Sequence, residues 1–157
     1  MTVPDLVELD TLDRKLLVAL TEDATQSAGA LARRFGLSQP ATWRRIRRLY
    51  DSGAIKGQRL ALDQERLGFG VTVFLGLKLA TKGRVSLQDF ERAVAAIPEV
   101  QAVEHVLGLY DYRLRVVARD IADFERVLRR RIMTLPGVGD VEANVLLSEE
   151  RRPGPSG

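Results

Sequence analysis

The chain of 157 residues contains no cysteine, one histidine and one tryptophan. The absence of cysteine excludes disulfides, thiolate metal sites and a cysteine nucleophile, and it is typical of a reducing compartment. No apolar run reaches the roughly 18 residues of a membrane span, and the start, MTVPDLVELD, is too acidic for a signal peptide. We therefore predict a cytoplasmic protein with no membrane partner.

Positive charge is scarce overall but concentrated in one place. Basic side chains exceed acidic ones by only three, 24 against 21, so the chain is no uniformly basic coat for nucleic acid. Residues 39–50, however, hold four arginines and no acid. Like charges three or four residues apart on a helix repel each other. The segment is therefore either a solvated face or a docking face for an anion.

Around this segment the sequence predicts three helices. Apolar residues at helical spacing indicate helices over residues 11–21 and 27–35, and Gly36 suits the left-handed turn that ends the second one. Ser38 is a good N-cap for a third helix, and Pro40 fits its first turn. Two helices joined by so short a turn, with the second one basic, are typical of a helix-turn-helix.

The apolar stripe of the third helix predicts which of its side chains face outward. We expect the DNA-binding residues to be Ser38, Gln39, Pro40, Trp43, Arg44, Arg47 and Arg48. Arginine forks pair with phosphates or guanine edges, and a glutamine can read adenine. Two interpretations of Trp43 stay open, contact with a thymine methyl or sugar and burial against the first helix. A helical bundle with a solvated basic face is the alternative for the whole segment.

The second half contains an internal repeat. Phe-Glu-Arg recurs 34 residues apart, at Phe90 and Phe124, whereas Pro-x-Val-x-x-Val-Glu recurs 38 residues apart, at Pro98 and Pro136. The difference is about one helical turn, so the second copy should have the longer helix. Each copy reads as a helix, a stop at proline and a strand.

A strand with alternating apolar residues precedes each copy, at residues 71–79 and 112–118. The order βαββαβ predicts a ferredoxin-like fold, with an antiparallel sheet that carries both helices on one face. The other face would hold Thr72, Phe74, Lys78, Arg113 and Arg115. That mixture is too polar for a core and too apolar for plain solvent, so we interpret it as a partner-binding face.

The predicted class is α+β, and the chain divides into four parts. An N-terminal winged-type helix-turn-helix domain covers residues 1–57, and a short strand (QRLAL) with a hinge forms a linker at 58–70. The ferredoxin-like ligand-binding and oligomerisation domain covers 71–148. The tail, residues 149–157, is charged and then rich in Pro, Gly and Ser, which predicts disorder.

From about Leu9 to Ser148 the chain resembles the Lrp/AsnC family, the leucine-responsive or feast/famine transcription regulators. The resemblance lies in LDTLDRKLLVAL, ALARRFGLS, GAIKG, GLYDYRLRV and LPGV, in that order. It implies a sequence-specific regulator that binds double-stranded DNA as a homodimer and assembles into octamers or larger arrays. It also implies a small effector, most often an amino acid, bound between subunits near the loop that joins the second and third strands.

By position, Gly108 and Asp111 match the Gly-x-x-Asp of the family, and Tyr110 would form a wall of the effector site. Glycine permits close backbone approach, and an acid at a loop can hold an α-ammonium group. Asp111 could equally be a turn residue that bonds to its own backbone. Tyr112 is expected in the core.

Two other functions fit the resemblance less well. Some relatives are siroheme decarboxylases, which use histidine and arginine around a tetrapyrrole. Here the only histidine, His105, lies on the strand face of Val103, which favours a hydrogen-bonded structural role. The sequence holds no paired acid and base, Ser/His arrangement or metal-ligand spacing, so we expect no enzyme, no metal and no cofactor. A DNA-architectural protein without an effector is the other alternative.

Overall fold

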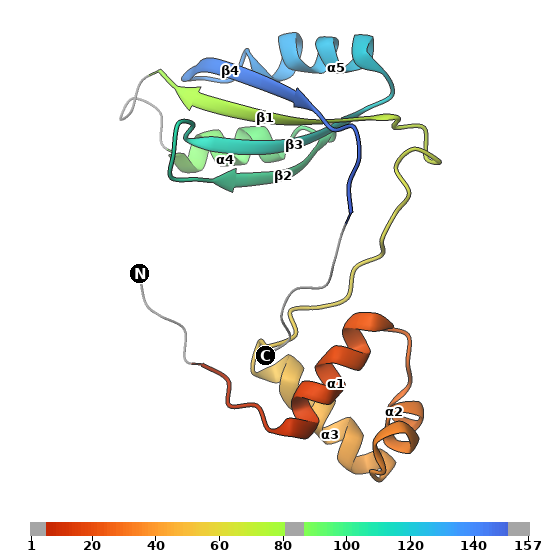
Figure 1. Ribbon diagram of the computed structural model, residues 1–157. Coiled ribbons are helices and arrows are strands. Elements are labelled where there is room, and N and C mark those ends of the chain that lie inside the picture. Colours follow the sequence, from red (N-terminus) through yellow and green to blue (C-terminus); the bar gives the residue numbers. More distant parts are fainter. Residues whose placement is uncertain (1–5, 81–86, 151–157) are drawn as a thin grey trace. The chain divides into compact units, whose positions relative to one another are not determined.

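The computed structural model describes residues 6–80 and 87–150, which form two compact units (Figure 1). One unit is built on the chain up to Ala61, and the other spans Leu62–Glu149. The predicted disordered tail lies outside the described residues beyond Glu150. No helix in the described ranges is long and apolar enough to cross a membrane.

The first unit contains the three predicted helices, α1 (Thr11–Glu22), α2 (Ala28–Phe35) and α3 (Gln39–Asp51). Each begins at a side-chain cap, because the oxygen of Asp10, Ser27 or Ser38 accepts a hydrogen bond from a backbone N–H in the first turn. Gly36, at φ 66°, ends α2 in the left-handed conformation. The helix-turn-helix prediction is confirmed.

The core of this unit lies between the helices. Leu16 and Ala19 of α1 are buried against Leu31 of α2, and Ile46 of α3 packs on them. Trp43 is not part of this core, since 55% of the residue is exposed. Of its two interpretations, burial against the first helix is therefore wrong.

The strand expected at residues 58–62 is absent, so the described part of the first unit has no wing. A strand needs a neighbour to receive its backbone hydrogen bonds. This segment is held by a side chain instead: the Gln58 amide donates to the Ala24 carbonyl at 3.2 Å and to the Tyr50 hydroxyl at 3.1 Å. The linker prediction was wrong in this respect.

The second unit is the predicted βαββαβ module. Its elements are β1 (Val71–Leu79), α4 (Leu87–Ala95), β2 (Val100–His105), β3 (Tyr112–Ala118), α5 (Ile121–Val127), a π-helical turn η1 (Leu128–Ile132) and β4 (Val138–Val145). The strands pair antiparallel in the order β2-β3-β1-β4. The longer second helix of the repeat is present as α5 continued by η1.

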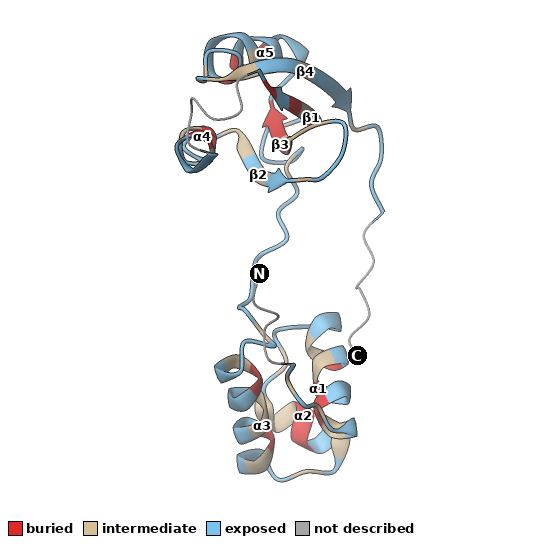
Figure 2. Ribbon diagram, turned by 90° about the vertical axis from the view of Figure 1, so that its left-hand side faces the viewer, coloured by how far each residue is buried: buried red, intermediate tan, exposed pale blue. Residues whose placement is uncertain are grey.

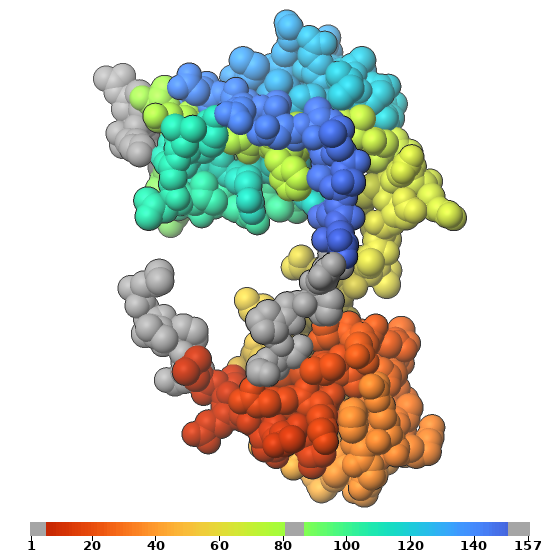
Figure 3. All heavy atoms as spheres, in the orientation of Figure 1, coloured from red at the N-terminus to blue at the C-terminus, as the bar shows by residue number. Residues whose placement is uncertain are grey.

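Both helices cover the same face of the sheet. Phe90 and Val94 of α4 and Phe124 of α5 share one buried cluster with Leu75 of β1 and Leu114 of β3. None of the described helices lies on the opposite face, and Figure 3 shows atoms of β1, β3 and β4 at the surface there. The alternation predicted from the sequence is thus correct on both faces.

Candidate DNA-binding helix and effector pocket

The outer side of α3 carries every residue predicted to bind DNA. Ser38, Gln39, Pro40, Trp43, Arg44, Arg47 and Arg48 are all exposed. Figure 2 shows the division along this helix, with buried residues toward α1 and α2 and exposed ones on the far side. The buried positions are Thr42 and Leu49.

The four arginines of this helix differ in their partners. Arg45 donates from Nη1 to Asp13 Oδ1 at 2.9 Å and to Asp10 Oδ2 at 2.5 Å. Arg48 donates from Nη2 to Asp13 Oδ2. Arg47 makes a 3.3 Å contact with Asp51, and its guanidinium lies 5.8 Å from the centre of the Trp43 ring. The arginines therefore do not form one uniform charged face.

Asp13 is the residue that sequence reasoning missed here. Its side chain is fully buried, although it stands in the first turn of α1, where the sequence predicts a favourable interaction with the helix dipole. Asp10 and Asp13 form a capping box, in which each carboxylate accepts the other residue's backbone N–H. The Asp13 N–H and the Arg45 guanidinium lower the pKa of Asp10, and Asp10 in turn raises the pKa of Arg45.

A small cavity of about 330 Å³ opens beside these pairs and is lined by Ala41, Arg44, Arg45 and Arg48. Two of the three arginines that line it, Arg45 and Arg48, are paired with Asp10 and Asp13, whereas a guanidinium without a carboxylate partner favours an anion such as a phosphate. No acidic partner of Arg44 occurs among the described residues. Arg44 is consequently the arginine of α3 best placed to meet DNA without competition.

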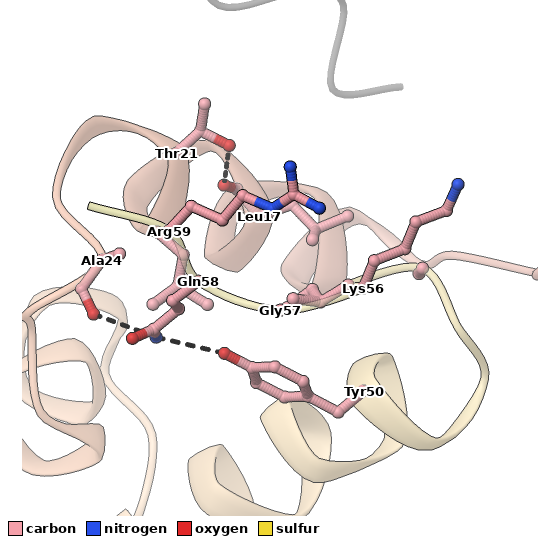
Figure 4. Close-up of a pocket in the computed structure, with 11 residues that line it drawn as sticks. Leu17, Thr21, Ala24, Tyr50, Lys56, Gly57, Gln58 and Arg59 are labelled. Carbon is pink, nitrogen blue, oxygen red and sulfur yellow. Dashed lines mark hydrogen bonds between the residues drawn. The ribbon is translucent and has the colours of Figure 1, made fainter. Parts of the chain in front are cut away.

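A second cavity of about 330 Å³ lies on the same unit between the ends of α1 and α3. Residues 54–59 fold across it, and Figure 4 shows the Gln58 side chain reaching both Ala24 and Tyr50. Leu17 and Leu20 form part of its apolar wall. The hydrogen bonds of Gln58 attach the chain that leaves α3 to its own domain.

The predicted effector residues are only partly brought together. A cavity of about 270 Å³ opens on the bare face of the sheet. Its lining comprises Phe74, Leu75, Gly76, Val106, Gly108, Leu109, Tyr110, Tyr112, Arg113 and Asn144. Gly108 and Tyr110 line this cavity, whereas Asp111 is not among its lining residues. That these residues bind an effector stays a prediction.

Tyr110 lines this cavity from the loop between β2 and β3. Its hydroxyl donates to Glu142, and Glu142 also accepts from the Asn144 amide at 3.1 Å. The hydrogen bond to Glu142 raises the pKa of Tyr110, and the same bond lowers the pKa of Glu142. Arg113, another lining residue, pairs with Glu104 at 2.6 Å.

Asp111 holds the loop between β2 and β3 in place. Its carboxylate accepts the Leu79 N–H at 2.9 Å, its N–H donates to the Leu77 carbonyl, and its carbonyl accepts the Val106 N–H. These are the contacts of a residue that bonds to backbone. The carboxylate thus anchors the loop to β1, 32 positions away along the chain, rather than to its own backbone as a turn residue would. Contact of Asp111 with an effector stays a prediction.

Tyr112 lies in the core, as predicted, and its hydroxyl donates to Glu91 at 2.8 Å. Burial, followed by that carboxylate, raises its pKa to about 12. His105 stacks on the Tyr112 ring with 4.8 Å between centroids and is exposed. His105 therefore lies at the edge of the sheet, stacked on an aromatic ring, rather than inside the core.

The described residues contain no cluster of His, Cys, Asp or Glu that could hold a metal ion. The groups that could hold a ligand are instead an apolar wall, one arginine and a few amide and hydroxyl groups on the bare sheet face. Neither the pocket nor α3 brings a base and a nucleophile together. The arrangement suits binding of DNA and of a small molecule.

Comparison with known proteins agrees with this geometry. Residues 9–50 match the AsnC-type helix-turn-helix domain, and residues 72–155 match the Lrp/AsnC ligand binding domain. A proline dehydrogenase transcriptional activator of Rhizobium radiobacter is 35% identical over 147 residues, which are 94% of each chain. The Bkd operon transcriptional regulator of Pseudomonas aeruginosa is 36% identical over 138 residues, 88% of this chain and 90% of that one.

Solved structures show the same likeness across both units. The crystal structure of an AsnC family regulator from Agrobacterium tumefaciens superposes with a TM-score of 0.83 at 33% identity, covering 92% of this chain and 94% of that one. A regulator from Neisseria meningitidis, solved as a complex with L-Met, gives a TM-score of 0.86 at 26% identity, with coverage of 92% and 94%. From its two domains and these relatives, the chain belongs to the Lrp/AsnC family and is a DNA-binding transcription regulator rather than an enzyme.

Proposed function

We propose that this regulator reads DNA through the exposed side of α3, with Arg44, Arg47 and Trp43 as principal contacts. The observation that supports this is the division of one helix into two faces, of which the inner one completes the core of the domain. A helix of this kind fits the major groove, where arginine and the edge of an aromatic ring meet bases and sugars. The N-terminus of α3, with Ser38, Gln39 and Pro40, would then lie against the phosphate backbone of the DNA.

The test compares Arg44→Ala and Arg47→Ala with Arg34→Ala, which removes an arginine from α2 that pairs with Glu22. The DNA is a duplex selected by the wild-type protein from a randomised pool. Each α3 variant should weaken binding with unchanged folding, by about 1–3 kcal/mol on the selected site if it reads guanine. If it meets a phosphate, the slope of log affinity against log salt should fall by about 0.9. Unchanged affinity in both α3 variants contradicts the proposal.

We further propose that the cavity on the sheet face is the effector site and that its ligand is an amino acid with an apolar side chain. Phe74, Val106 and Leu109 supply the apolar wall, and Arg113, which the carboxylate of the ligand would share with Glu104, supplies a cation. The volume of about 270 Å³ lies just below the range of drug-sized pockets, about 300–1,000 Å³, which suits a small ligand. The L-Met complex of the Neisseria meningitidis regulator supports the same class.

A thermal-shift screen of the amino acids tests this site. A ligand at 100 times its Kd should add about 2.7 kcal/mol to the free energy of unfolding of the second unit. The best ligand should then change the affinity for the selected duplex, because a ligand shifts an equilibrium only when it binds one state better. DNA binding that is indifferent to every amino acid would favour the DNA-architectural alternative.

The bare sheet face also suggests how copies of the chain assemble. It places Phe74 beside the paired Arg115, whose guanidinium lies 5.4 Å from the centre of the Phe74 ring. An apolar patch with a polar rim is typical of an association surface. We infer that two copies pair through this face as a homodimer and that dimers assemble further into octamers or larger arrays. Such dimers would bind half-sites about one helical turn, 34–36 Å, apart. The regulator would act on chromosomal DNA in the cytoplasm.

A further inference from the structure

The charge of Asp13 has no structural task of its own in the capping box. An amide oxygen at the same position accepts a backbone N–H equally well, and glutamine replaces glutamate in such boxes. A buried carboxylate is costly unless it is paired, and this one is fully buried at the junction of α1 and α3. Its charge is therefore kept for its two partners, Arg45 and Arg48.

The geometry points to a restraint on DNA binding: we infer that Asp13 is a positioning residue that withholds Arg45 and Arg48 from the DNA phosphates. This inference rests on the proposed role of α3. The four groups Asp10, Asp13, Arg45 and Arg48 form a neutral network. A phosphate that took Arg48 would leave Asp13 buried with one partner fewer.

Exposure shows that the restraint acts on groups within reach of DNA. The Arg48 side chain is 56% exposed and lies on the outer side of α3, and it borders the cavity shared with Arg44. An arginine already neutralised by a carboxylate neutralises no phosphate and so displaces few of the counterions condensed on DNA; it therefore adds little to the part of the affinity that is independent of sequence. Asp13 would thereby lower binding to random DNA and leave discrimination to Arg44, Arg47 and Trp43.

The decisive experiment measures affinity against salt concentration for the full chain, on the selected duplex and on a scrambled duplex of the same composition. In Asp13→Asn the cap acceptor remains and Arg48 is released. Affinity for the scrambled duplex should rise several-fold, its salt slope should steepen by about 0.9, and the ratio of selected to scrambled affinity should fall. In the double variant Asp13→Asn with Arg48→Ala these gains should disappear.

One control separates the loss of the Asp13 charge from a general change in net charge. Glu22→Gln removes one acid from the same unit, where it pairs with exposed Arg34, so it reproduces the change in net charge. An unchanged or shallower slope in Asp13→Asn, or an equal steepening in Glu22→Gln, overturns the inference.

A second comparison holds even if Asp13→Asn does not fold. Arg48→Ala leaves Asp13 paired with Arg45. It should reduce the slope of log affinity against log salt much less than Arg44→Ala does. Equal losses in the two arginine variants overturn the inference. If neither Arg44→Ala nor Arg47→Ala changes the affinity for DNA or its salt slope, the proposed role of α3 is refuted instead.

Discussion

The ring of Tyr110 lies so close over Gly76 that a Cβ atom on this glycine would stand 2.6 Å from the ring carbon Cδ2. Gly76 is in the middle of β1, where glycine ordinarily weakens a strand, and here it marks a close approach. The tyrosine comes from the loop between β2 and β3 and is tied to Glu142 of β4. The contact between the two residues thus holds that loop against β1 in the lining of the proposed effector cavity.

We predict that Gly76→Ala displaces the Tyr110 ring and removes effector binding. The added methyl group has no room under the ring, so the hydrogen bond to Glu142 should break, although alanine itself suits a strand at least as well. Calorimetric titration of the best amino acid should show at least a tenfold loss of affinity, and DNA binding without effector should persist. The matched control is Gly70→Ala, just before β1. Effector binding retained in Gly76→Ala would remove Tyr110 from the site.

At Asp111 two substitutions distinguish a loop anchor from a ligand to an ammonium group. Asp111→Asn keeps an oxygen that can accept the Leu79 N–H, whereas Asp111→Ala does not. We expect the asparagine variant to retain the effect of amino acid on operator affinity and the alanine variant to lose it. Loss of that effect in both variants, with folding intact, would instead indicate that the carboxylate charge holds the ligand.

Tyr112 predicts an alkaline limit to stability. Unfolded tyrosine ionises near pH 10, whereas burial and Glu91 raise the pKa of Tyr112 to about 12 in the folded protein. The folded state therefore holds its proton longer, and this contribution to stability is complete below about pH 10 and is lost as the pH rises toward 12. Chemical unfolding of wild type at pH 8 to 11.5 should show the decline.

In Tyr112→Phe that part of the decline should be absent. The variant should also lose about 0.5–1.5 kcal/mol at neutral pH, because the hydrogen bond to Glu91 is removed. Tyr50→Phe, in the other unit, serves as the matched control. The same alkaline decline in wild type and Tyr112→Phe would contradict the assignment.

Phe74 tests the proposed assembly through the sheet face. Phe74→Glu places a charge at the centre of that face, and it also removes the ring against which Arg115 lies. The full chain should shift from an assembly to a smaller species in light scattering at micromolar concentration, with α3 still able to bind short DNA weakly. Lys78→Glu reverses a charge nearer the end of the same strand and should have little effect; an unchanged mass in Phe74→Glu would move the interface elsewhere.

Local patterns in the sequence determined most of the architecture. Caps at Asp10, Ser27 and Ser38 and the left-handed turn at Gly36 are decided by a few neighbouring atoms, so they can be read from residue types. The alternation along Val71–Leu79 likewise sets the two faces of β1, because successive side chains point to opposite sides. The repeat, through its four extra residues, predicted the longer second helix that ends in η1.

Pairings between distant residues were decided only by the tertiary structure. Asp13 and Arg48 are 35 positions apart, and nothing local distinguishes a carboxylate that is buried under two arginines from one that merely caps a helix. The same holds for Tyr110 over Gly76 and for Asp111 on the backbone of Leu79. The prediction of a strand at residues 58–62 was wrong for a related reason. A strand requires a neighbour that pairs with its backbone hydrogen bonds, and the sequence of the segment does not contain that neighbour.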